Sequence, residues 1–249
     1  MTIISTVITS VGIIQMSDSF VTYRDGSTKK KPKLFEIPTE FGGVAAVAGC
    51  YQVAGEEMET WLPSIADDLA DTSLESFARR LGRLLEVNTT QEDRDDGFLI
   101  HVAGYERSSE TGLPSPEMWF VRNIAGMDLQ GEYEGRTQEF QVTEDFWPHY
   151  TEGLPDAPTG TVTIPAQFMN GFTPGRVAFN EFGRNLFGVF RNIWEYPGFD
   201  FDPPSTLEEM ARVFELQMKA VCVLASMSHY EAPLIGEPIQ LKSIHPPVT

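Results

Sequence analysis

The feature that constrains the fold most is a run of β-branched residues over positions 2–9, TIISTVIT. β-Branched side chains favour extended backbone, so this run predicts a strand that begins at Thr2. Gly12 follows at a turn position, and residues 13–16 predict a second strand, which is followed by Asp18 and Ser19. Thr2 is therefore either part of the strand framework or a functional group held at the end of a strand.

The order of the remaining patterns predicts an α+β fold. The expected strands lie at 34–37, 44–48, 98–103, 117–121, 140–142 and 238–244, and the expected helices at 56–70, from 72 onward, 176–194 and 206–228. Two antiparallel sheets face to face, with a helix pair outside each, would bury every apolar stripe. We therefore expect a four-layer αββα sandwich, although layer logic alone does not exclude other α+β arrangements.

Helix signals support this order. One apolar stripe at helical spacing follows Thr72, and its members are Leu74, Phe77, Leu81, Leu84 and Leu85. Thr72 with Glu75, and Ser205 with Glu208, predict capping boxes at two helix starts. Pro63 is expected in a first turn or at a kink.

The chain is expected to form one domain over residues 1–249. It contains no repeat, no low-complexity tract and no linker with a composition shift on both sides. Residues 144–175 are rich in Pro, Gly and Thr, and predict no clear element. They are read as a long connecting loop, with a lid over a site as the alternative.

Charge and composition exclude several function classes. The net charge of −18 repels nucleic acid and anionic membranes, although a basic cluster at residues 29–33, read as a solvated loop, stands against it. No apolar run approaches the roughly 20 residues that span a bilayer, and no positively charged leader marks a signal peptide. Two cysteines are too few for a disulfide framework. We expect a cytoplasmic protein.

The sequence gives only weak signals for a thiol nucleophile, a metal site or a nucleotide-binding motif. Cys50 and His101 could form a thiol nucleophile with its base, but a single buried cysteine is more often a small core residue. The four histidines, at positions 101, 149, 229 and 245, lack metal-ligand spacing. No phosphate-binding loop or dinucleotide glycine pattern is present, so no cofactor and no metal are expected.

Thr2 offers a different chemistry if Met1 is removed, which a small second residue permits. Its hydroxyl would then lie beside its own α-amino group, whose pKa of about 7.7–8.0 lets it act as a base near neutral pH. A neighbouring cation would lower this pKa, a carboxylate would orient the cation, and a glycine N–H could hold an oxyanion.

The residues that fit these needs resemble the β-subunits of proteasomes and the related bacterial heat-shock peptidase, which are N-terminal-nucleophile hydrolases. With Thr2 at the catalytic threonine of the family, the match runs without a gap through Gly12 to Asp18 and Ser19. KLFEI is similar to the strand that carries the catalytic lysine, here Lys33, after a one-residue deletion. AVAGC is similar to the strand end that supplies the oxyanion N–H, here Gly49. The resemblance is strong over residues 2 to about 50 and returns at IGEPIQLKSI, residues 235–244.

The resemblance implies a threonine hydrolase of peptide or amide bonds. Thr2 would be the nucleophile, Lys33 and Asp18 would tune its amine, and Gly49 would hold the oxyanion. Ser19 would contact substrate. The resemblance also implies a homo-oligomeric ring, and it names neither the ring size nor any ATPase partner.

Departures from the family pattern leave a second reading open. The family has an Asp and a Ser just before its glycine-rich turn, whereas this chain has EAPLIG at residues 231–236, where Glu231 could substitute for the acid. A further supporting serine has no match around residues 173–176. The alternative is a catalytically silent subunit that acts in assembly or binding.

Overall fold

Strand β1 (Ile3–Thr9) is buried on both faces, which explains its unbroken apolar and β-branched composition. Ile4 and Ile8 point to one side, where they pack against a second sheet, and Ile3 and Val7 point to the other side. The computed structural model describes residues 2–68, 72–124, 136–144, 166–171, 173–194, 204–227 and 235–247. The predicted strand is therefore confirmed, but it begins one residue later than expected, with Thr2 directly before it.

Two antiparallel sheets carry the fold. The first has the order β12-β1-β2-β13, in which β2 is Gly12–Ser17, β12 is Ala166–Gly171 and β13 is Gln240–Ile244. The second has the order β11-β10-β9-β6-β5, with β5 Leu34–Ile37, β6 Gly43–Gly49, β9 Phe98–Arg107, β10 Pro114–Ile124 and β11 Arg136–Glu144. Two short hairpins complete the strands, namely β3 (Phe20–Thr22) with β4 (Thr28–Lys30), and β7 (Gln52–Val53) with β8 (Glu56–Glu57).

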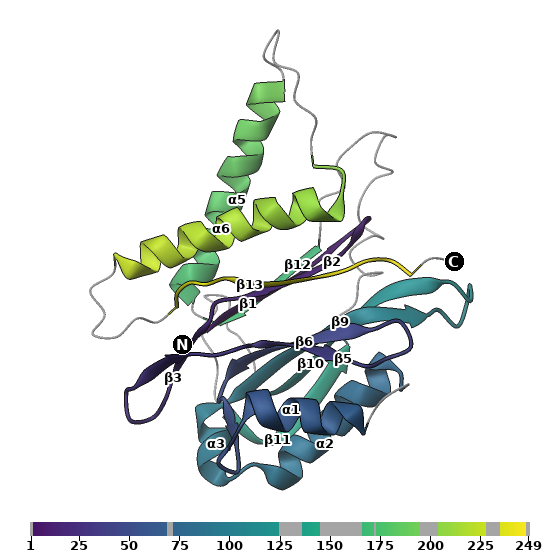
Figure 1. Ribbon diagram of the computed structural model, residues 1–249, viewed down its shortest axis with the longest axis vertical. Coiled ribbons are helices and arrows are strands. Elements are labelled where there is room, and N and C mark those ends of the chain that lie inside the picture. The colour runs from purple at the N-terminus through teal and green to yellow at the C-terminus, as the bar shows by residue number, and fades with distance from the viewer. Residues whose placement is uncertain are drawn as a thin grey trace.

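Helices cover the outer faces of both sheets (Figure 1). Helices α5 (Thr173–Trp194) and α6 (Leu207–Ser226) lie on the side of the four-stranded sheet, and α1 (Met58–Asp67), α2 (Leu74–Asn88) and α3 (Gln91–Asp96) on the side of the five-stranded one. Three apolar clusters fill the spaces, one between the sheets and one under each helix group. The α+β class predicted from the sequence is confirmed.

Several local predictions need correction. Ser73, not Thr72, caps α2, and Thr206 with Glu209, not Ser205 with Glu208, forms the capping box of α6. Neighbouring hydroxyl and acidic residues satisfy the same motif one position apart, so the pattern fixes a cap only to within a residue. Pro63 lies inside α1 rather than in its first turn.

Other corrections concern whole elements. The acidic residues 92–96, for which no helix was expected, belong to the helix α3, because Thr90 and Asp93 form a capping box that starts it. Strand β12 and the start of α5 lie within residues 144–175, where no element was assigned, and residues 145–165 lie outside the described residues. Part of the basic cluster, read as a solvated loop, is strand β4.

A buried polar network joins the two sheets near the centre of the molecule. His101 on β9 makes hydrogen bonds with Thr6 on β1 (Nδ1 to Oγ1, 2.9 Å) and with Asn170 on β12 (Nε2 to Nδ2, 2.8 Å). Gln15 on β2 donates to the same Thr6 hydroxyl at 3.1 Å. Burial lowers the pKa of His101 to about 3, so the ring is neutral and structural.

Candidate active site

Three of the predicted site residues meet at the start of β1. The Lys33 ammonium donates one hydrogen bond to Thr2 Oγ1 at 2.8 Å and another to Asp18 Oδ1 at 2.8 Å. A third goes to the carbonyl oxygen of Phe20 at 2.5 Å. Thr2 is 8% exposed, while the side chains of Lys33 and Asp18 are 1% and 0% exposed. The structure thus brings together a hydroxyl, a cation and a carboxylate that lie 31 residues apart at most.

Asp18 also fixes the backbone on which Thr2 sits. Its Oδ1 accepts from the N–H of Ile3 at 3.0 Å, and its Oδ2 accepts from the N–H of Phe20 at 2.9 Å. In return, the Asp18 N–H donates to the Ile3 carbonyl at 3.2 Å. The carboxylate therefore holds both the residue after Thr2 and the ammonium beside it.

The hydrogen bonds indicate which charges the buried pair carries. An ammonium has three N–H donors and a neutral amine only two, and Lys33 Nζ lies beside three acceptors. Burial lowers the pKa of Lys33 and raises the pKa of Asp18. The negative charge of Asp18 opposes the shift at Lys33, and the positive charge of Lys33 opposes the shift at Asp18. An ammonium at Lys33 and a carboxylate at Asp18 satisfy all of these contacts, with Lys33 as the donor in each.

Gly171 at the end of β12 makes room for Thr2. A Cβ at this position would lie 1.8 Å from the Thr2 carbonyl oxygen, and the φ angle of +116° is one that side chains rarely allow. Gly171 is paired with Ile3 in the sheet. No sequence pattern marked this residue, because β12 itself was not predicted.

No described bond joins Gly49 or Ser19 to Thr2, Lys33 or the Asp18 carboxylate. Gly49 ends β6 with φ +89°, and a Cβ there would meet the Gly97 carbonyl oxygen at 2.1 Å, so only glycine fits. Ser19 donates its hydroxyl to the Gly236 carbonyl at 3.4 Å. It also lines a surface pocket of about 480 Å³, but neither Thr2 nor Lys33 lines that pocket.

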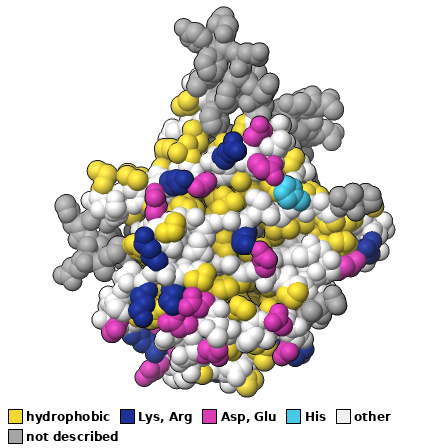
Figure 2. Space-filling model, in the orientation of Figure 1, with side chains coloured by type: hydrophobic (Ala, Val, Ile, Leu, Met, Phe, Trp, Pro, Cys, Tyr) yellow, Lys and Arg dark blue, Asp and Glu magenta, His cyan; other side chains and the backbone are white. Residues whose placement is uncertain are grey.

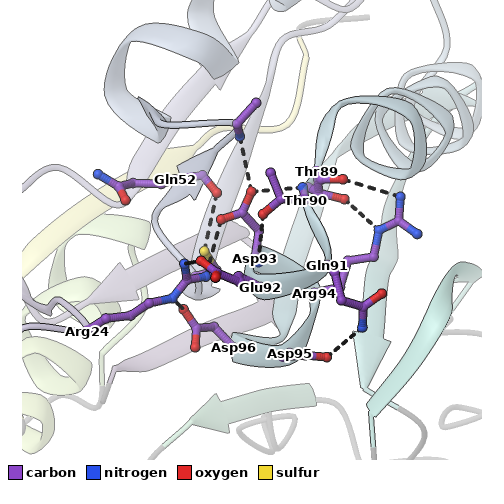
Figure 3. A network of polar contacts seen from close by, with 12 residues as sticks. Arg24, Gln52, Thr89, Thr90, Gln91, Glu92, Asp93, Arg94, Asp95 and Asp96 are labelled. Carbon is purple, nitrogen blue, oxygen red and sulfur yellow. Dashed lines mark hydrogen bonds and ion pairs between the residues drawn. The ribbon is translucent and has the colours of Figure 1, made fainter.

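An ion-pair network fixes the β3–β4 hairpin, which carries the chain from Asp18 toward Lys33 (Figure 3). Arg24, in the turn of this hairpin, pairs with Glu92 at 2.9 Å, Asp93 at 3.3 Å and Asp96 at 2.6 Å. Asp93 also accepts from the N–H of Ala54 at 3.1 Å. The hairpin is thereby tied to α3 and to the loop that follows β7.

The alternative thiol site is not assembled. Cys50 donates to the Gln52 carbonyl at 3.2 Å, and burial raises the pKa of its thiol to about 11, so it stays protonated. His101, its suggested base, bonds instead to Thr6 and Asn170. Within the described ranges, no group of three or more His, Cys, Asp or Glu side chains could hold a metal ion.

Comparisons with known proteins were made at the level of sequence and of structure. The chain matches no protein-family model and no curated protein sequence. Solved structures similar to it include the helical Anbu assembly from Pseudomonas aeruginosa, with a TM-score of 0.52 and 15% identity over 98% of this chain and 81% of that one. Anbu, an ancestral β-subunit, from Yersinia bercovieri aligns with a TM-score of 0.50 and 12% identity over the same shares. This chain has a proteasome-type fold.

A third similar structure is the eukaryotic HslV from Trypanosoma brucei, with a TM-score of 0.46 and 17% identity over 98% of this chain and 99% of that chain. At these identities the likeness of the Anbu structures shows the proteasome-type fold alone. The chemistry must therefore be argued from the residues around Thr2. No helix in the described part of the chain is long and apolar enough to cross a membrane.

Proposed function

We propose that the chain is a threonine-type N-terminal-nucleophile hydrolase of peptide or amide bonds, built as one domain in a four-layer αββα arrangement. The observation that carries the proposal is the single ammonium that bonds both the Thr2 hydroxyl and the Asp18 carboxylate. A buried lysine that serves only stability would need its carboxylate partner, but it would not need a hydroxyl on the residue directly before a strand.

The proposed reaction begins when Met1 is removed and the Thr2 amine is free. Thr2 Oγ1 attacks the carbonyl carbon of the scissile bond, and the α-amine takes the hydroxyl proton. The Lys33 ammonium already uses its three N–H groups as donors, so it stabilises the developing negative charge on Oγ1 and does not accept the proton.

The remaining steps follow from the same groups. The Gly49 N–H is proposed to bind the oxyanion of the tetrahedral intermediate. The α-ammonium returns its proton to the leaving amine, and an ester on Thr2 remains. Water, deprotonated by the amine, hydrolyses this ester and restores the hydroxyl. Ser19 is proposed to contact the substrate chain.

We further propose a cytoplasmic homo-oligomer. The related Pseudomonas aeruginosa protein forms a helical assembly. Three exposed apolar side chains of α6, Leu216, Val223 and Leu224, form one stripe with the exposed Met227, which directly follows the helix. Such a stripe suits contact with a second copy, since the net charge of −18 disfavours a charged interface. Patches of hydrophobic side chains also lie between the charged ones on the face in Figure 2.

A peptide boronate tests the proposed nucleophile, because a nucleophilic hydroxyl converts trigonal boron to tetrahedral boron, which ¹¹B NMR distinguishes. The protein without Met1 is expected to form the tetrahedral adduct, and Thr2→Ser is expected to keep it. Thr2→Ala, with the free amine retained, is expected to lose it. Folded wild type without Met1 that forms no adduct would favour the silent subunit, which the missing Asp and Ser before Gly236 also favour.

A further inference from the structure

The backbone on either side of Pro32 has no free polar group. The Lys31 N–H donates to the Ser19 carbonyl at 2.8 Å, and Val47 donates to the Lys33 carbonyl at 2.9 Å. Pro32 has no N–H, and its carbonyl accepts from the Tyr51 hydroxyl at 2.5 Å. These bonds satisfy three of the five backbone donors and acceptors of this three-residue segment, 31–33, and buried or partly buried backbone requires partners for the other two as well.

One distant side chain supplies the two remaining bonds of segment 31–33. Gln240 Oε1 accepts from the Lys33 N–H at 2.7 Å, and Gln240 Nε2 donates to the Lys31 carbonyl at 2.6 Å. An amide carries one acceptor and one donor group at its end, so it fits this pair of backbone groups as a neighbouring strand would. Gln240 lies 207 residues away from Lys33 in the sequence.

Because Gln240 lies on a strand of the four-stranded sheet, its bonds connect segment 31–33 to that sheet. Gln240 is the first residue of β13, an edge strand of the four-stranded sheet, where it is paired with Ser17, the residue before Asp18. Segment 31–33 leads into β5, an edge strand of the other sheet. The amide thus joins the strand next to Asp18 to the backbone of Lys33.

We propose that Gln240 is a positioning residue that sets where the Lys33 ammonium lies relative to Thr2 and Asp18. Gln240 touches none of the reacting atoms and acts through the Lys33 backbone. The inference rests on the proposed function for its effect on reactivity, but the effect on Lys33 itself does not depend on catalysis. Tyr51, which lies between β6 and β7, bonds the same segment through the Pro32 carbonyl and is expected to act in the same direction.

The test compares Gln240→Leu with Gln167→Leu. Leucine keeps most of the volume and removes both amide bonds. Gln167 is a matched control because it is also half-buried on an edge strand of the four-stranded sheet, β12, and makes one long bond to Ser5 at 3.5 Å. Three quantities are measured: the rate at which a peptide epoxyketone labels Thr2, hydrogen exchange of the Lys33 N–H, and titration of the Lys33 side chain by ¹³C NMR.

Gln240→Leu is expected to slow labelling by roughly ten- to a hundredfold, as small displacements of a catalytic group do. It is also expected to speed exchange at Lys33 and to shift the titration of its ammonium, since the contacts with Asp18 and Thr2 loosen. Tyr51→Phe is expected to slow labelling less, because it removes one bond instead of two. Gln167→Leu is expected to leave all three quantities at wild-type values.

Labelling of Gln240→Leu at the wild-type rate would overturn the positioning role, whatever the exchange shows. If the wild type itself is not labelled, the proposed function fails, and the exchange and titration of Lys33 decide the inference alone. Wild-type values of both in Gln240→Leu would then overturn it, whereas shifts of both would support it.

Discussion

At the scale of single residues, we expect Lys33 to serve both reactivity and stability. Replacing it with alanine leaves the Asp18 carboxylate buried with only its two backbone N–H partners. Because an unpaired buried charge is costly, we expect Lys33→Ala to lower the free energy of unfolding by about 3–5 kcal/mol. Urea titration measures this loss. Lys242→Ala, which breaks an exposed pair with Glu36, is expected to cost at most about 1 kcal/mol.

A second variant separates the two roles of Lys33. Lys33→Met combined with Asp18→Asn removes both charges, so it is expected to recover part of the stability lost in Lys33→Ala. Binding of the boronate should stay absent, because no cation faces Thr2. A double variant that binds the boronate as wild type does would remove Lys33 and Asp18 from the mechanism.

Gly171 is expected to matter because of its contact with Thr2. In Gly171→Ala the new Cβ would overlap the Thr2 carbonyl, and neither backbone can move without breaking the β1–β12 ladder. We expect a loss of about 1–3 kcal/mol in unfolding free energy and slower epoxyketone labelling. Gly188→Ala on α5 is the control, since nothing lies within 4 Å of its added Cβ, and it should gain about 0.5–1 kcal/mol. Equal effects of the two substitutions would contradict the role of Gly171.

At the scale of elements, His101 makes the contact between the sheets sensitive to acid. Its pKa of about 3 in the folded chain lies below the ordinary 6.5, so the unfolded chain binds the proton first. The contribution of the neutral ring is complete above about pH 6.5 and is lost as the pH falls toward 3. At pH 5 we expect a loss of about 2 kcal/mol from this residue.

Chemical unfolding at several pH values measures this loss as the difference between wild type and His101→Gln, in which no proton binds at that position. If the unfolding free energies of the wild type and of His101→Gln fall in parallel below pH 6, then His101 does not gain a proton on unfolding, and the pKa that burial indicates is contradicted.

The elements also show what the sequence could predict and what it could not. Runs of apolar or β-branched residues located β1, β5 and β6, an apolar stripe at helical spacing located α2, and a capping signal marked the start of α6 to within one residue. These signals could not locate β12, since its six residues, AQFMNG, have no β-branched run and follow a stretch rich in Pro and Gly. The arrangement of α5 and α6 on one sheet follows from packing, which a local pattern does not contain.

The candidate site, like the fold, was predicted only in part. Thr2, Asp18 and Lys33 were identified through the family resemblance, and the structure brings them together. Gln240 and Gly171 were not identified, because each acts through a backbone group of a residue far away in the chain. The residues before Gly236 that depart from the family pattern, 231–234, lie outside the described residues.

At the scale of the whole molecule, the apolar stripe of α6 favours the proposed assembly, and the net charge of −18 opposes it. The double substitution Val223→Glu, Leu224→Glu is expected to weaken association by tenfold or more, since burial of each side chain contributes about 1.5–3 kcal/mol. Light scattering over a concentration series measures it. Val87→Glu, at an isolated exposed position of α2, should leave the assembly intact.

Salt gives a second test at this scale. Because subunits of like charge repel one another, added salt is expected to strengthen association of the wild type. A wild type that remains a monomer at micromolar concentration in high salt would contradict the homo-oligomer.

The most direct test of the central claim is an intact-mass spectrum of protein made in cells, recorded before and after treatment with a peptide epoxyketone. This electrophile reacts with both the hydroxyl and the free α-amine of an N-terminal threonine. The account predicts the mass of a chain that begins at Thr2 and then one adduct, mapped to Thr2 and absent in Thr2→Ala. Full retention of Met1, or a processed chain that forms no adduct at Thr2, would contradict it.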